Sequence, residues 1–285
     1  MRNNQPVTQR EVALTPQQKL ISTTDARGVI TYCNDAFVDI SGFDRADLIG
    51  APQNIVRHPD VPPAVFAHMW SALKQGRPWM GIVKNRSRNG DHYWVNAYVT
   101  PIFEGSRVVG FESVRVKPTA DQIRRAESLY KRITQGKPAI PRQDTWQPAL
   151  LDCLPYLVMG LAGTVSGLFL SAPVAIAVTA GVAVPLGLLT SRWQQQGTLR
   201  LLQMAEPSTS DALVAQMYSD ERGPQGRLEA AFVSQAARLK TCLTRLQDTA
   251  EHLNDQARQS NTLAHNSSSG LELSLIHISE PTRPY

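Results

Sequence analysis

The sequence predicts an α+β domain on a five-stranded antiparallel sheet, followed by a transmembrane helical hairpin and a helical region. Three observations predict it. Residues 19–118 show two short strand patterns, several short helices and then three longer strands. Residues 153–191 carry no charge. Apolar residues then recur at heptad spacing, which is typical of helices that pair along a seam. The chain therefore divides into a folded domain, an anchor and a helical extension.

The sheet is predicted from one hairpin and a three-strand meander. After a polar arm over 1–18, strands are expected over 20–24 and 29–34, joined by the turn DARG. Three further strands are expected over 79–85, 92–102 and 107–116. The first two of these meet at SRNG, where Asn-Gly favours a tight turn. Strands that precede and follow a group of helices indicate an antiparallel sheet with helices on one face.

The helices are predicted from periodicity and from their stop signals. Short helices over 35–41 and 45–49 are each followed by a glycine suited to a helix C-terminus. A longer helix over 62–74 places Val65, Met69 and Leu73 at helical spacing. Residues 119–150 are expected to form a charged linker helix and then a Pro-rich segment. These helices account for the connections around the sheet.

The uncharged run predicts a membrane hairpin over 151–191. A helix of about 20 apolar residues crosses a bilayer once, and this run supplies nearly two such lengths with Pro173 near its centre. Arg142 and Arg192 flank it, so the positive-inside tendency places both ends in the cytoplasm and the chain in the cytoplasmic membrane. A buried core hairpin and a single long tilted span are the alternatives.

Within residues 192–270, helices are expected over 192–205 and 225–258, with breaks at 207–210 and 222–224. The apolar positions of a helix over 225–258 are spaced as in a heptad repeat: Leu228, Phe232, Leu239, Cys242 and Leu246. This spacing favours a homodimer seam, and an amphipathic helix packed on its own chain is the alternative. Residues 271–285 include LSLIHISEPTR, which resembles the translation of a transposase sequencing adapter. We expect this tail to be non-native and exclude it from fold reasoning.

Composition and motifs exclude several classes of protein. The net charge of +5 is spread along the chain, which does not indicate a nucleic-acid partner. The three cysteines, Cys33, Cys153 and Cys242, form neither a disulfide framework nor a metal-ligand spacing. Paired carboxylates, a nucleophile elbow and a P-loop are absent from the sequence. The sequence therefore does not predict an enzyme.

Four motifs carry a resemblance to a known family. GVITYCNDAF (28–37) resembles the PAS pattern of turn, strand, Asn and helix. NIVRHPDVP (54–62), WMGIVKNR (79–86) and GDHYWV (90–95) are similar to the aerotaxis receptor family. That resemblance implies a flavin-binding PAS domain, a membrane hairpin, a HAMP-like unit and a chemoreceptor signalling hairpin. The order of elements matches to about residue 265, so the chain is expected to be truncated before the signalling domain.

The resemblance also implies a function and partners. FAD bound to the PAS domain would exchange electrons with respiratory electron-transfer components, and its redox state would be the signal for aerotaxis. The HAMP-like region would pass the signal on. The family implies a chemotaxis kinase and a coupling protein as partners of the full-length protein only.

Five residues are candidates for binding FAD: Arg57, His58, Asp60, Trp79 and Asn85. An arginine offers a fork of donors to a phosphate, and a histidine responds to nearby charge. Asp60 is expected to accept from a ribose hydroxyl. A tryptophan presents a flat surface to the ring, and an asparagine both donates to and accepts from its edge. The ordinary alternatives are a surface arginine, a helix-start histidine, an N-cap, core packing and strand-end polarity.

Other functions stay open at this point. The PAS domain could be an interaction module without flavin, or could bind haem through His58, His68 or His92. The chain could also be the sensor part of a truncated histidine kinase or cyclic-nucleotide synthase. A light-driven cysteine adduct is not expected, because residues 54–57 contain no cysteine and Cys33 lies on a predicted strand.

Overall fold

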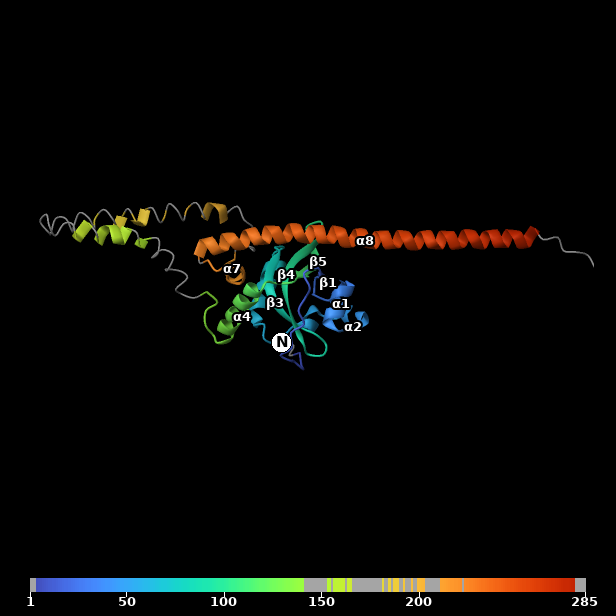
Figure 1. Ribbon diagram of the computed structural model, residues 1–285, viewed down its shortest axis with the longest axis horizontal. Helices are drawn as coiled ribbons and strands as arrows, with labels where there is room; N and C mark the ends of the chain where they lie inside the picture. Colours follow the sequence, from blue (N-terminus) through green and yellow to red (C-terminus); the bar gives the residue numbers. More distant parts are fainter. Residues whose placement is uncertain are drawn as a thin grey trace, which may run out of the picture. The chain divides into compact units, whose positions relative to one another are not determined.

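The computed structural model describes residues 4–140, 211–221 and 223–279, together with scattered residues between 153 and 202. The chain divides into two compact units, residues 1–237 and 238–285. Figure 1 shows the sheet of the first unit with its helices, and the long helix α8 that begins in the first unit and continues through the second.

The first unit contains the predicted five-stranded antiparallel sheet. Its spatial order is β2-β1-β5-β4-β3, so β2 and β3 are the edge strands. The strands are β1 (Leu20–Asp25), β2 (Ile30–Cys33), β3 (Trp79–Arg86), β4 (His92–Glu104) and β5 (Arg107–Val116). Every neighbouring pair is antiparallel, with Ile82 opposite Asn96 and Tyr98 opposite Val114. The predicted five-stranded antiparallel sheet is confirmed.

Four helical segments connect β2 to β3: α1 (Asp35–Ser41), α2 (Arg45–Leu48), the 3₁₀ helix η1 (Gln53–Val56) and α3 (Pro63–Lys74). Asn34 fixes the start of α1, because its side chain accepts from Phe37 N–H and Ile21 N–H and donates to the Lys19 carbonyl. Gly42, at φ 65°, ends the same helix in the left-handed conformation that glycine favours. These segments enclose one face of the sheet.

Two further helices pack on the other side of β3. The linker helix α4 (Ala120–Thr134) begins with a capping box between Thr119 and Gln122. The helix α7 (Ala212–Tyr218) begins at Asp211, whose side chain accepts from Leu213 N–H. The sequence did not predict α7. Both helices contact the edge strand β3 and each other.

The N-terminal arm, predicted to be polar, is folded against the domain from Asn4 onward. Glu11 forms a parallel bridge with His92, and Leu14 is buried in the core. The Asn4 side chain donates to the carbonyls of Asn54, Ile55 and Arg57, at 2.8, 3.1 and 2.8 Å. The arm therefore holds η1 and the residue that follows it, Arg57.

The helix α8 runs from Gly223 to Ser279. In the first unit its residues Ala230 and Ala231 are buried. In the second unit the side chains of Leu239, Leu246 and Leu253 are exposed. The helix predicted over 225–258 is confirmed and is longer than expected.

The structure contradicts the predicted transmembrane hairpin. In the part of the chain that the structure describes, no helix is both long enough and apolar enough to cross a bilayer. A crossing helix needs about 20 consecutive apolar residues, whereas α7 is short, and α4 and α8 carry charged residues along their length. This finding contradicts the hairpin and the cytoplasmic-membrane location predicted from it. Most of residues 151–191, the Pro-rich segment to 150 and residues 280–285 lie outside the described residues.

Candidate functional site

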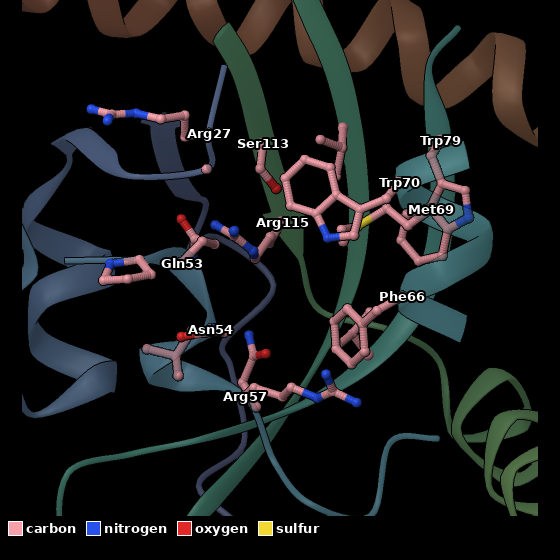
Figure 2. Close-up of a pocket in the computed structure, with 17 residues that line it drawn as sticks. Arg27, Gln53, Asn54, Arg57, Phe66, Met69, Trp70, Trp79, Ser113 and Arg115 are labelled. Atoms are coloured by element: carbon pink, nitrogen blue, oxygen red, sulfur yellow. The ribbon is translucent and has the colours of Figure 1, made fainter. Parts of the chain in front are cut away.

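A cavity of about 200 Å³ lies inside the first unit, between the sheet and the helical segments. Strands β3, β4 and β5 form one wall, and η1 and α3 form the other. Figure 2 shows aromatic side chains on one side of it and polar side chains on the other. The side chains that matter here are Arg27, Gln53, Arg57, Phe66, Met69, Trp70, Trp79, Asn85, Ser113 and Arg115.

Trp79 forms a fixed part of the aromatic wall. The residue is 1% exposed, and its ring covers Gly81, where an added Cβ would lie 2.2 Å from the ring. Its indole N–H donates to His68 Nδ1 at 3.0 Å. Phe66 and Trp70, both on α3, complete the aromatic side of the cavity (Figure 2). Flat apolar surfaces of this kind suit a planar ring.

Three polar atoms on the cavity wall lack a hydrogen-bond partner among the described residues. They are Gln53 Nε2, Asn85 Nδ2 and Ser113 Oγ, all of them buried. Burial raises the pKa of Tyr93, which lies opposite Asn85 on β4, and the charge of Arg115 and then the Asn85 amide act in the opposite direction. Because buried polar groups are normally hydrogen-bonded, these atoms indicate that the cavity takes a ligand with a mixed polar edge.

The charge on the wall is positive. Arg27, Arg57 and Arg115 line the cavity, and the described lining contains no carboxylate. Arg27 is exposed and pairs with Asp25 at 3.2 Å. The Arg57 guanidinium lies 4.0 Å from the centre of the Phe66 ring and donates to the Val61 carbonyl, and burial lowers its pKa. Such a wall favours a ligand that carries negative charge.

Arg115 is the most deeply buried of these cations. The residue is 6% exposed, and its Nη1 donates to Ser22 Oγ at 3.0 Å. Burial lowers the pKa of Arg115 to about 10, so the guanidinium is still protonated at neutral pH. Arg115 therefore places a positive charge inside the domain.

The structure brings three of the five predicted site residues to the cavity: Arg57, Trp79 and Asn85. An antiparallel bridge between the backbones of Arg57 and Asn85 joins the end of η1 to β3. This bridge is the reason that residues from two separate motifs share one wall.

His58 and Asp60 are not among the lining residues. His58 Nδ1 accepts from Asp60 N–H at 3.2 Å, and its ring meets His92 edge-on at 5.7 Å. The Asp60 carboxylate pairs with Lys84 Nζ at 2.7 Å. Asp60 and Lys84 line a second cavity of about 330 Å³, on the α4 side of β3. The ligand roles of His58 and Asp60 stay predictions, and their observed contacts support the segment that carries Arg57.

The sequence reasoning did not identify Gln53, Ser113 or Arg115. A signal for the last two exists, because Ser113 and Arg115 alternate with Val114 and Val116 along the strand. That alternation shows that the two polar residues share a face, but not which face meets the helices. Gln53 lies in a 3₁₀ helix that the sequence did not predict.

A hydrogen-bonded chain leads from the cavity to α7. Trp79 donates to His68 Nδ1, and His68 Nε2 lies 3.3 Å from Asp211 Oδ2. Burial alone would raise the pKa of Asp211, but the hydrogen bonds from His68 and Leu213 N–H outweigh it and lower that pKa. The indole at the cavity is thus two hydrogen bonds from the N-cap of α7.

The main chain of β3 gives a second connection. Ile82 N–H donates to Met217 Sδ at 3.4 Å, and Tyr130 O–H donates to the Ile82 carbonyl. The Tyr218 hydroxyl donates to Asn96 Oδ1 on β4 at 2.7 Å. Val83 and Asn85 line the cavity, while the main chain of Ile82, at the free edge of β3, contacts α4 and α7.

Comparison with known proteins agrees with this fold. Residues 30–115 match the family model of the PAS fold, which agrees with the five-stranded antiparallel sheet of the first unit. The chain is similar to the aerotaxis receptor of Escherichia coli, at 47% identity over 131 residues, which are 46% of this chain and 26% of that protein. The chain thus spans about a quarter of this relative's length.

Other proteins match a smaller part of the chain. The nitrogen fixation regulatory protein of Klebsiella pneumoniae is 37% identical over 82 residues, which are 29% of this chain and 17% of that protein. Among solved structures, the LOV domain of the photoreceptor Aureochrome1 has a TM-score of 0.35 at 18% identity, over 41% of this chain and 84% of that chain. The PAS domain of the fruit-fly ELK potassium channel has a TM-score of 0.33 at 22% identity, over 35% and 87%.

Proposed function

We propose that this chain is a redox-sensing signal transducer for aerotaxis whose PAS domain binds FAD. The observation that carries the proposal is the cavity itself, with flat aromatic walls, unpartnered amide and hydroxyl atoms, and arginines without a carboxylate. The similarity to an aerotaxis receptor supports the same function.

The residues of the cavity fit a flavin. Its planar ring suits the surface of Trp79, and its alternating donors and acceptors suit Asn85 and Gln53. The cavity of about 200 Å³ is smaller than the roughly 300–1,000 Å³ of sites that hold a whole drug-sized ligand. We therefore propose that the ring occupies the cavity and that the phosphates meet Arg57 or Arg27, which are more exposed than Arg115.

When bound, the flavin supplies electron exchange, and the protein supplies its position and its electrostatic surroundings. Respiratory electron-transfer components are the proposed electron donors. His58 and Asp60, predicted as ligands, are proposed to hold the Arg57 segment through their contacts with His92 and Lys84. A chemotaxis kinase and a coupling protein are proposed partners of a longer protein.

The proposed output is a change in the packing of α4 and α7 on β3. A ligand that moves Trp79 or Asn85 also moves the strand whose Ile82 main chain bonds Tyr130 and Met217. The chain of contacts Trp79–His68–Asp211 connects the cavity wall to α7 as well. Two packings of α7 would bias the HAMP-like helical region that follows, as a population shift between two states.

The test is the flavin content of the purified full chain. We expect it to carry the visible absorbance of oxidised flavin, and Trp79→Phe to reduce flavin occupancy severalfold. Trp94→Phe is the matched control, because Trp94 is also buried but stacks on Tyr130 on the α4 side of the sheet. A wild-type chain that folds, stays colourless and takes up no added FAD would leave a PAS interaction module without a cofactor.

The haem alternative has less support in this structure. His58, His68 and His92 are the histidines of the PAS domain, and none of them lines the cavity. A haem needs a side chain that reaches its iron. A haem absorption spectrum from the purified chain would overturn the flavin assignment.

A further inference from the structure

Arg115 is a buried cation that the protein does not neutralise. Its guanidinium donates to the Ser22 hydroxyl and lies 5.1 Å from the centre of the Phe37 ring. No carboxylate in the described ranges forms an ion pair with it. A buried charge without a counter-ion destabilises a fold, so the position indicates that a bound group supplies the negative charge.

The surroundings of Arg115 indicate which part of a ligand it meets. Figure 2 shows Arg115 between Gln53 on one side and the aromatic side chains of Trp70 and Trp79 on the other, with Ser113 beside it on β5. Ser113 Oγ and Gln53 Nε2 are among the unpartnered polar atoms of the wall. Arg115 thus lies where the aromatic part of the cavity wall meets its polar part. A planar ring bound in the cavity would lie beside it.

The other two arginines of the wall are less suited to this role. Arg27 is solvent-exposed and paired with Asp25. Arg57 lies over Phe66 and donates to the Val61 carbonyl. Only Arg115, of the three, combines deep burial with the absence of a carboxylate.

We propose that Arg115 is the counter-ion of an anionic reduced flavin ring and so sets the reduction potential of the site. The inference rests on the proposed function, because it takes the ligand to be a flavin. A neutral oxidised ring gains two electrons from a donor, dithionite in the test, and one proton from solvent. The charge of the second electron stays on the ring, because Arg115 stabilises the anion against uptake of a second proton.

The experiment measures the midpoint potential of the flavin in the full chain against pH. One proton for two electrons gives a slope of about 30 mV per pH unit, and two protons give about 59 mV. The measurement is made below pH 7, where a reduced flavin outside a protein takes up its second proton. We expect the smaller slope for the wild type. Arg115→Gln should weaken the preference for the reduced ring at least tenfold, which lowers the potential by about 30 mV or more. Arg115→Lys, which keeps the charge, should retain part of the effect.

Arg107→Gln is the matched control, because it removes an exposed arginine from the same strand. It should leave the potential unchanged. A wild-type slope of about 59 mV per pH unit, or an unchanged potential in Arg115→Gln, overturns the role of Arg115 while the flavin function stands. If Arg115→Gln does not fold, the pH slope of the wild type and the midpoint potential of Arg115→Lys test the proposal instead. If Arg115→Gln weakens FAD but not riboflavin, Arg115 binds phosphate and the inference is overturned.

The failure of the proposed function has a different signature. A folded wild-type chain that binds no flavin removes both proposals at once. Retained flavin with altered potentials in the Arg115 variants supports both.

Discussion

Single polar side chains join parts of the PAS domain that are far apart in the sequence. Asn34 connects α1 to β1 through three hydrogen bonds. Asn4 connects the N-terminal arm to the segment that carries Arg57. Arg86 Nε donates to the Pro6 carbonyl in the same arm. These contacts determine where the cavity-lining segments lie, although the side chains themselves do not line the cavity.

Asn4→Ala should destabilise the domain. The change leaves the carbonyls of Asn54, Ile55 and Arg57 without the Asn4 amide, and an unsatisfied buried polar group costs about 1–3 kcal/mol. Urea unfolding of the full chain, followed by tryptophan fluorescence, measures the change. Gln17→Ala removes an exposed amide from the same arm and should have no effect. Equal stability of both variants would show that the arm is not held through Asn4.

His58 should make the domain less stable in acid. Burial first, and then the charge of Lys84, lower its pKa from 6.5 to about 4, while Asp60 acts in the opposite direction. The unfolded chain therefore binds this proton at a higher pH than the folded chain does. The free energy of unfolding should fall as the pH drops from about 6.5 to about 4.

Urea midpoints at a series of pH values measure this dependence, and His58→Gln should flatten it. His92 keeps a residual slope of the same sign, because burial lowers its pKa as well. An identical pH dependence in His58→Gln and the wild type would exclude His58 as the titrating group.

At the scale of elements, β3 shows how an edge strand is used. Edge strands expose main-chain groups that invite aggregation, and here Tyr130 and Met217 cover those of Ile82. One face of β3 lines the cavity and its free edge meets α4 and α7. The strand is therefore placed to link a ligand to helices outside the sheet.

The elements that the sequence predicted are those with strong local signals. The strand over 107–116 and the helix over 35–41 have the predicted bounds, because alternation, an N-cap and a stop glycine mark them. In contrast, α7 has few local signals and is held mainly by contacts such as that of Met217 with Ile82. Short elements of this kind depend on tertiary packing, which a local pattern does not contain.

Asp211→Ala should loosen α7. The change removes the N-cap bond to Leu213 N–H at 2.7 Å and the contact with His68. Loss of an N-cap costs about 1 kcal/mol, so amide exchange in Ala212–Tyr218 should become several times faster. Hydrogen exchange with mass spectrometry measures this, and Asp121→Ala, in the exposed pair with Arg124, is the control. Unchanged amide exchange in α7 would show that Asp211 does not stabilise the start of this helix.

At the scale of the whole molecule, the site was only partly predictable. Arg57, Trp79 and Asn85 lie in motifs that the resemblance marks, whereas Ser113 and Arg115 depend on which face of β5 meets the helices. That face is set by the pairing of β5 with both β1 and β4. The membrane hairpin was inferred from hydropathy and flanking charge and is the part of the predicted fold that is contradicted.

Exposed leucines on α8, in the second unit, predict how the chain assembles. Leu239, Leu246 and Leu253 follow one another at heptad intervals on α8 and are 67, 69 and 60% exposed. Cys242 is exposed on the same helix and falls at the second core position of the heptad. A helix with such a stripe is stabilised when a second copy covers it. We therefore predict a parallel homodimer through α8.

Sedimentation velocity of the full chain measures the dimer, and mild oxidation should link two copies through Cys242, because equivalent core positions of a parallel pair lie close together. Leu246→Lys should dissociate the dimer and Cys242→Ser should abolish the cross-link. Asn254→Lys adds the same charge at an exposed position outside the seam and should do neither. A monomer at all concentrations, with no cross-link, would indicate that the stripe packs against the chain's own residues instead.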